Sequence, residues 1–132
     1  MYNIEINGEV YPLRFGFGFI REIDGMETRK SPSGANQNIG LAVAAAGLID
    51  KNVEQLARIL FIANRTEEPK ISKKELEEYI ESTDDLDGIF EMVTDFFTRA
   101  NCTKTTMKRV QEEAEKAKKV QDALVKMANP KE

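Results

Sequence analysis

The chain carries few of the side chains that enzymes use for catalysis. Its 132 residues contain no histidine and a single cysteine, Cys102. Covalent catalysis needs a nucleophile that a neighbouring base activates, and histidine, the usual base, is missing. A zinc site needs several thiolate or imidazole ligands, so Cys102 is expected to be a small buried hydrophobe. We therefore expect a protein that is not an enzyme and that uses neither a metal ion nor a cofactor.

Two short motifs resemble ligand-binding loops without completing them. Gly16 to Arg21 begins like a dinucleotide loop, but Arg21 stands where a third glycine is required. Asp85 to Gly88 resembles the middle of a calcium loop, but Thr83 and Thr94 occupy the positions that need an aspartate and a bidentate glutamate. The glycines instead favour a tight strand-to-helix junction, and the aspartates favour a helix cap.

A dense run of carboxylates lies in the second half of the chain, and no basic residue interrupts it. Carboxylates between capped helices are typical of a solvated face, and a docking patch for a basic partner is the alternative. The run consists of Glu75, Glu77, Glu78, Glu81, Asp84, Asp85, Asp87, Glu91 and Asp95.

The end of the chain differs from the rest in charge. Residues 103–132 hold 8 basic and 5 acidic side chains, whereas residues 1–102 hold 11 and 18. The lysines of this tail are interleaved with carboxylates, and no aromatic side chain there offers a nucleic-acid base a stacking surface. A solvated helix or a protein-docking arm is therefore favoured over nucleic-acid binding.

The beginning of the chain predicts a β-hairpin. Residues Tyr2 to Ile6 alternate apolar and polar side chains, as in a strand with one solvated face. Asn7-Gly8 favours the positive backbone angles of a type I′ turn, and the apolar residues from Val10 to Phe15 supply the second strand. Pro12 cannot donate to a ladder, so this strand should lie at an edge or pair through its other side.

The remaining pattern predicts helices joined by loops. Two capping boxes, Asn52 with Gln55 and Ser72 with Glu75, mark helix starts, and the composition of residues 25–38 is that of a surface loop. We predict a mainly α chain with an N-terminal β-hairpin (α+β), forming a compact domain of about five helices plus a C-terminal amphipathic helix. Apolar spacing places these helices at residues 17–24, 39–49 (uniformly apolar and therefore buried), 53–64, 72–80, 86–100 and from 103 on.

The predicted C-terminal helix has a thin apolar stripe. Its apolar positions keep three-to-four spacing, but most of the side chains are small, so this helix gains little by packing. We expect a globular domain over residues 1–102 and a basic helix over residues 103–132 that either projects or docks on a partner. Formation of a homo-oligomer through this stripe stays open.

The opening residues resemble a known family. Ile4 to Asp24 is similar to the pattern I-N-G-x-x-Y-x-L-x-F-G-x-x-F-I-R-E-(I/L)-(D/N) that recurs at the start of tail assembly chaperones of long-tailed phages and prophages of Gram-positive bacteria. The order of the later helices, over about the first hundred residues, also resembles that family.

The resemblance implies a function in phage assembly. Such a chaperone binds the tape measure protein, keeps its apolar helices from aggregating and helps the tail tube protein assemble around it. It is absent from the mature virion, and a ribosomal frameshift often produces a longer form. No apolar run approaches the roughly 20 residues of a membrane span and no signal peptide opens the chain, so we expect it in the host cytoplasm.

An apolar groove between helices is the expected binding site for the helices of this client. Candidate lining residues are Met92 and Phe96 on the helix at 86–100, together with Val120, Leu124 and Met127 in the tail. The alternative is that Met92 and Phe96 belong to the core. Two other functions stay open, namely a structural tail or head-completion protein of the virion and a small nucleic-acid-binding regulator.

Overall fold

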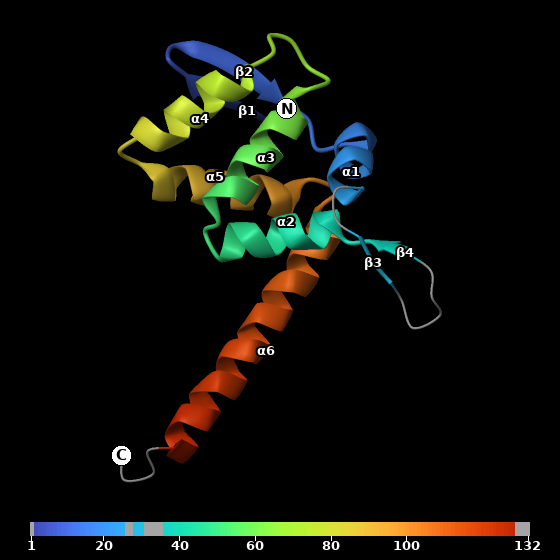
Figure 1. Ribbon diagram of the computed structural model, residues 1–132, viewed down its shortest axis with the longest axis vertical. Helices are drawn as coiled ribbons and strands as arrows, with labels where there is room; N and C mark the ends of the chain where they lie inside the picture. The colour runs from blue at the N-terminus through green and yellow to red at the C-terminus, as the bar shows by residue number, and fades with distance from the viewer. Residues whose placement is uncertain (1, 26–27, 31–35, 129–132) are drawn as a thin grey trace.

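A computed structural model describes residues 2–25, 28–30 and 36–128 (Figure 1). A hairpin opens the chain and helices make up most of the rest, which confirms the predicted α+β class. The elements are β1 (Tyr2–Ile6), β2 (Glu9–Leu13), α1 (Phe17–Asp24), β3 (Thr28–Lys30), β4 (Asn36–Asn38), α2 (Gly40–Ile49), α3 (Val53–Asn64), α4 (Lys73–Ser82), α5 (Leu86–Arg99) and α6 (Lys104–Ala128).

Strands β1 and β2 form the predicted antiparallel hairpin, in which Ile4 pairs with Tyr11. Asn7 and Gly8 have φ angles of 53° and 83°, which confirms the turn that their sequence predicts. The sheet has only these two strands, so Pro12 lies on an edge strand as expected.

Helices α3 and α5 cover the hairpin. The amide of Arg14 donates to the carbonyl of Ala63 at the end of α3, over 2.8 Å. The ring of Tyr2 lies 4.7 Å from that of Phe96 on α5. An isolated hairpin is marginally stable in water, so this covering is what allows it to form.

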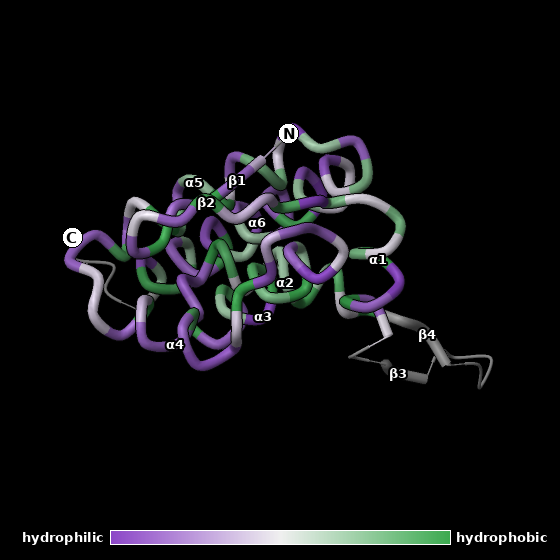
Figure 2. Tube along the Cα trace, turned by 90° about the horizontal axis from the view of Figure 1, so that it is seen from above, coloured by the Kyte–Doolittle hydropathy of each residue, from purple (hydrophilic) through white to green (hydrophobic). Residues whose placement is uncertain are grey.

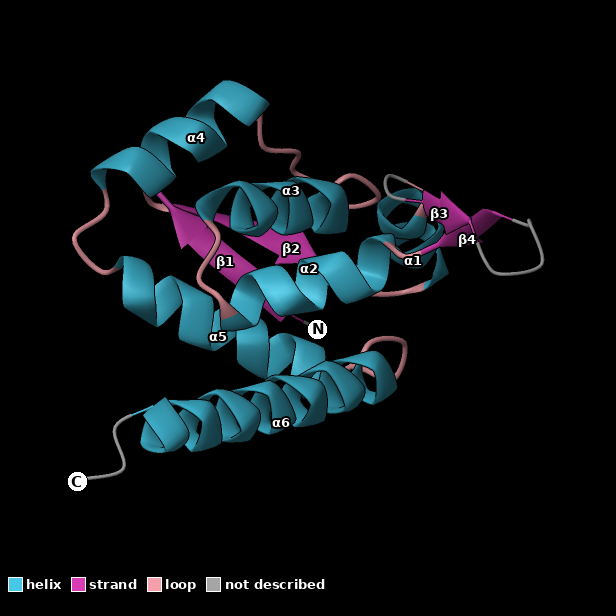
Figure 3. Ribbon diagram, turned by 60° about the horizontal axis from the view of Figure 1, so that its bottom comes forward, coloured by secondary structure: helices cyan, strands magenta, loops and turns pink. Residues whose placement is uncertain are grey.

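The uniformly apolar helix α2 lies in the middle of the molecule, as predicted. It packs against α1, α3, α5 and α6 (Figure 3). Figure 2 shows the hydrophobic segments, α2 among them, gathered in the interior. Gly40 allows α2 to start directly against α1, since a Cβ atom there would overlap the carbonyl of Ile23.

Two sequence predictions need correction. Residues 25–38 were expected to form a loop, but Thr28–Lys30 pairs antiparallel with Asn36–Asn38. Backbone hydrogen bonds make such a short ladder without an apolar run, so composition does not reveal it. The remainder of that segment, 26–27 and 31–35, lies outside the described residues. Cys102 is partly exposed rather than buried.

Helix α6 belongs to the core at its start and leaves it further on. Met107 and Val110 are buried, and the hydroxyl of the buried Thr103 donates to the carbonyl of Phe97 over 2.8 Å. Residues 115–127 are all exposed, and this part, here called the arm, extends away from the other helices (Figure 1). The division of the chain into domains at residue 102 stays a prediction.

Candidate functional site

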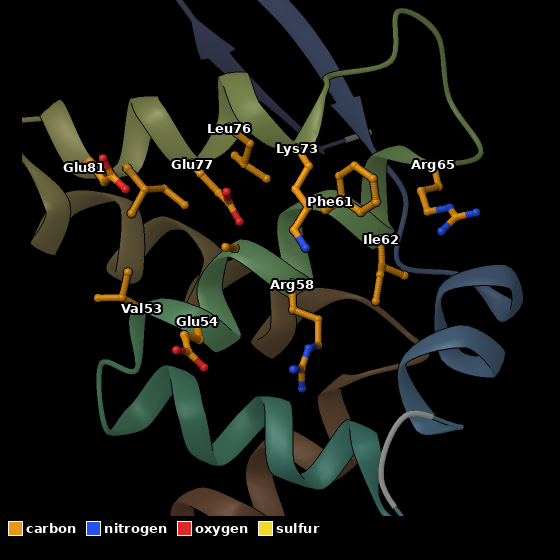
Figure 4. A pocket seen from close by; sticks show the side chains of 12 residues that line it. Val53, Glu54, Arg58, Phe61, Ile62, Arg65, Lys73, Leu76, Glu77 and Glu81 are labelled. Atoms are coloured by element: carbon orange, nitrogen blue, oxygen red, sulfur yellow. The ribbon is translucent and has the colours of Figure 1, made fainter.

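A groove between α3 and α4 has a volume of about 560 Å³ (Figure 4). Apolar side chains alternate with charged ones along it. We call it the α3–α4 groove; its lining residues are Val53, Glu54, Ala57, Arg58, Phe61, Ile62, Arg65, Lys73, Leu76, Glu77, Ile80 and Glu81.

The helices that form the two walls of this groove, α3 and α4, each begin with a side-chain cap. The side chain of Asn52 accepts a hydrogen bond from the amide of Gln55, over 3.0 Å. The hydroxyl of Ser72 accepts one from the amide of Glu75, over 3.1 Å. Both caps fall where the sequence predicts them, so local signals set where α3 and α4 begin.

The buried Asn64, at the end of α3, holds α4 in its place. Its amide nitrogen donates to the carbonyls of Pro12 and Pro69, over 2.9 and 3.1 Å. Its side-chain oxygen accepts from the amide of Ile71, over 2.8 Å. One side chain thus ties the hairpin and the loop before α4 to α3, which sets the spacing of the groove walls.

A second tie joins the hairpin to α4. The hydroxyl of the buried Tyr11 donates to Oε1 of Glu75 over 3.2 Å. Burial raises the pKa of Tyr11 above its ordinary value of 10.0, and the hydrogen bond to the Glu75 carboxylate raises it further. The folded state thus favours the protonated phenol.

This raised pKa predicts a loss of stability in alkali. The stability that the protonated Tyr11 contributes to the fold is fully present below the pKa of tyrosine in the unfolded chain, about 10. It is lost as the pH rises through the higher pKa of the folded state. Tyr11→Phe lacks the ionisable group, so it should lose less stability than the wild type between about pH 8 and pH 11. Urea unfolding of both proteins at several pH values measures this; equal losses would contradict it.

The acidic run from Glu75 to Asp95 mostly faces solvent, as predicted for a solvated face. Asp85 accepts from the amide of Gly88 at the start of α5, over 3.1 Å. Asp87 pairs with Lys51 at 2.9 Å, and this hydrogen bond raises the pKa of Lys51. Among the residues that the structure describes, no group of three carboxylate or thiol side chains is placed to hold a metal ion.

The structure separates the five predicted site residues. Phe96 lies in the core, and Met92 is partly buried and packs against it. Val120, Leu124 and Met127 lie on the arm with 60%, 59% and 75% of their surface exposed. The arm therefore presents large, mostly exposed apolar side chains.

A family model described as phage tail assembly chaperone protein, TAC, matches residues 3–112. The chain belongs to this family. No curated protein and no solved structure matches the chain.

This assignment places the molecule among proteins that act as chaperones in phage tail assembly. In this chaperone, the matched residues include both walls of the α3–α4 groove and end just before the arm. Within the described part of the chain, no helix is both long and apolar enough to cross a membrane.

The sequence prediction of the site did not include the α3–α4 groove. Its walls come from helices whose apolar stripes each look like ordinary core packing. One local signal was available, because Lys73, Glu77 and Glu81 follow each other at four-residue spacing and so share a face of α4.

Proposed function

We propose that the client of this chaperone is the tape measure protein of a long-tailed phage, and that the arm binds one of its amphipathic helices. The observation that carries the proposal is the exposure of Val120, Leu124 and Met127 on one side of a projecting helix. Large apolar side chains at three-to-four spacing are the anchors through which helices recognise one another.

The arm has the dimensions that helix pairing needs. Its 13 residues span about 20 Å, and their first turn continues a helix that the core already holds. A helix of this length is marginal alone, so the docked turns of α6 supply the nucleus from which it extends. A client helix then finds a preformed partner, which reduces the cost of ordering on binding.

In this proposal Met92 and Phe96 stabilise the core and do not contact the client. Phe96 packs on Tyr2 within the core, and α5, which carries both residues, contacts α6. They hold the helix on which the first turns of α6 rest, and the arm makes the contact with the client.

The proposal extends to the course of assembly. A chaperone that covers apolar client helices in the host cytoplasm must leave as the tail tube protein takes its place around the client. We therefore propose that the protein is absent from finished particles. Mass spectrometry of purified virions tests this, and its presence there at tail-protein stoichiometry would favour a structural role in the virion.

Leu124→Asp is expected to weaken capture of the tape measure protein about tenfold or more, because the new carboxylate would be buried without a partner in the helix pair. The stability of the chaperone should stay within about 0.5 kcal/mol of the wild type, because most of the surface of Leu124 is exposed in the free protein. Affinity capture after co-expression, together with urea unfolding, measures both quantities.

Lys118→Gln is the matched control. It changes the net charge by the same amount, and residue 118 points about 120° away from Leu124 on the helix. Capture should stay near the wild-type level. Equal losses for the two variants would show that charge, and not the apolar side of the arm, governs binding.

A further inference from the structure

The charges that border the α3–α4 groove are sorted along its length. Figure 4 shows Glu54, Glu77 and Glu81 toward one end, whereas Arg58, Lys73 and Arg65 lie toward the other. The two helices run in opposite directions, so the start of α3 and the end of α4 together form the acidic end.

Helix α4 carries these charges in the order that its own dipole disfavours. Lys73 and Lys74 open the helix, where the dipole is positive, although Glu75 in the same turn suits the dipole. The last turn contains no basic residue but does contain Glu81. An isolated helix would be more stable with acidic residues in its first turn and basic residues in its last turn. Local rules that a sequence breaks in this way often mark a functional surface.

The apolar floor of the groove suits a helix. Phe61, Leu76 and Ile80 line it, with the small Ala57 among them, so a neighbouring helix has room to approach. The 12 residues of α3 give the groove a length of about 18 Å, enough for three turns of an occupant. Arg65 is already paired with Glu22 at 2.9 Å, so the basic end is partly compensated.

We propose that the α3–α4 groove is a second site for the client, and that it selects an amphipathic helix of defined polarity. The occupant carries lysine or arginine in its first turns and glutamate or aspartate in its last, and it runs parallel to α3. Its basic first turns, and the positive end of its dipole, then meet Glu54, Glu77 and Glu81. This inference rests on the proposed function, because it takes the helix that occupies the groove to be part of the client.

The arm of a second copy fits this groove less well. It carries Lys116 near its start and Lys126 near its end, so one lysine would lie against the basic end of the groove. A client helix with segregated charges satisfies both ends, and self-association is therefore a test outcome that opposes the proposal.

Two synthetic peptides of about 14 residues test the polarity. They share one composition and one leucine spacing, and differ only in whether the lysines come first and the glutamates last or the reverse. By fluorescence anisotropy, the lysine-first peptide should bind about tenfold more tightly, and this preference should shrink as salt is raised. The glutamate-first peptide is the more helical when free, so helix propensity works against the expected result.

Exchanging charges on α4 tests whether the preference for the lysine-first peptide arises in the groove. The triple variant Lys73→Glu, Glu77→Lys and Glu81→Lys should lose the preference, because each end of the groove then holds both signs. Its fold should be at least as stable as the wild type, since the new order suits the dipole of α4. A control, Lys74→Glu with Glu78→Lys, exchanges charges beside the groove at unchanged net charge and should keep the preference.

Equal binding of the two peptides to the wild type would overturn the inference, as would a preference that survives the triple exchange. Concentration-dependent dimerisation of the wild type that the triple exchange abolishes would also overturn it, in favour of a second copy. The peptides do not involve the tape measure protein. A failure of the polarity rule is therefore distinguishable from a failure of the proposed function, which would appear as loss of client capture.

Discussion

Phe97→Ala is expected to lower the free energy of unfolding by about 3–5 kcal/mol. The ring is fully buried on α5 and lies 5.5 Å from the ring of Phe15 and 5.9 Å from that of Phe19. Its removal opens a cavity where the strand-to-helix junction, α1 and α5 meet, and the surrounding rings cannot all move to fill it. Urea or thermal unfolding followed by circular dichroism measures the loss.

Phe17→Ala is the matched control, because it removes the same side chain from α1 where 71% of the surface is exposed. Its effect should stay within about 0.5 kcal/mol, allowing for the contact of its ring with Arg21. A loss for Phe97→Ala no larger than that for Phe17→Ala would contradict the packing described here.

Asn64→Asp is expected to cost about 3 kcal/mol, although it changes the shape of the side chain very little. The amide nitrogen that donates to the carbonyls of Pro12 and Pro69 becomes an oxygen that repels them. The carboxylate is also buried, since residue 64 is 1% exposed. Chemical denaturation measures the cost, and looser placement of α4 should make its amides exchange faster with deuterium.

Asn101→Asp provides the control for the same chemical change at an exposed position. It should leave the unfolding free energy within about 0.5 kcal/mol of the wild type. Equal effects of the two substitutions would show that Asn64 does not tie the hairpin and α4 to α3.

Local signals in the sequence predict much of the fold. Asn7-Gly8 sets the hairpin turn, and the capping side chains of Asn52, Ser72 and Asp85 mark the starts of three helices. Each of these signals acts within a few residues of the chain, so it can be read without knowing what packs against it.

Features that depend on distant residues escape such reading. Asn64 is only the last residue of a predicted helix in the sequence, and its partners at Pro12, Pro69 and Ile71 alone reveal a buried anchor. Phe96 continues an amphipathic stripe, and the ring of Tyr2 that covers it comes from the opposite end of the chain. The sorting of charge along the α3–α4 groove likewise appears only when two helices are placed side by side.

The start of the arm also cannot be predicted from the sequence. A uniform three-to-four spacing runs through the whole of α6, so the sequence does not separate its docked turns from its exposed ones. The boundary depends on where the other helices end and leave α6 uncovered. The arm lies beyond the matched residues 3–112, and the α3–α4 groove lies within them. We therefore expect related chaperones to share the groove more widely than the arm.

Co-expression of this chaperone with the tape measure protein encoded near it tests the central claim most directly. Affinity capture followed by size-exclusion chromatography should give one soluble complex of the two proteins, whereas the tape measure protein expressed alone should be insoluble. A tape measure protein that is soluble alone, or that never elutes with the chaperone, would contradict the account.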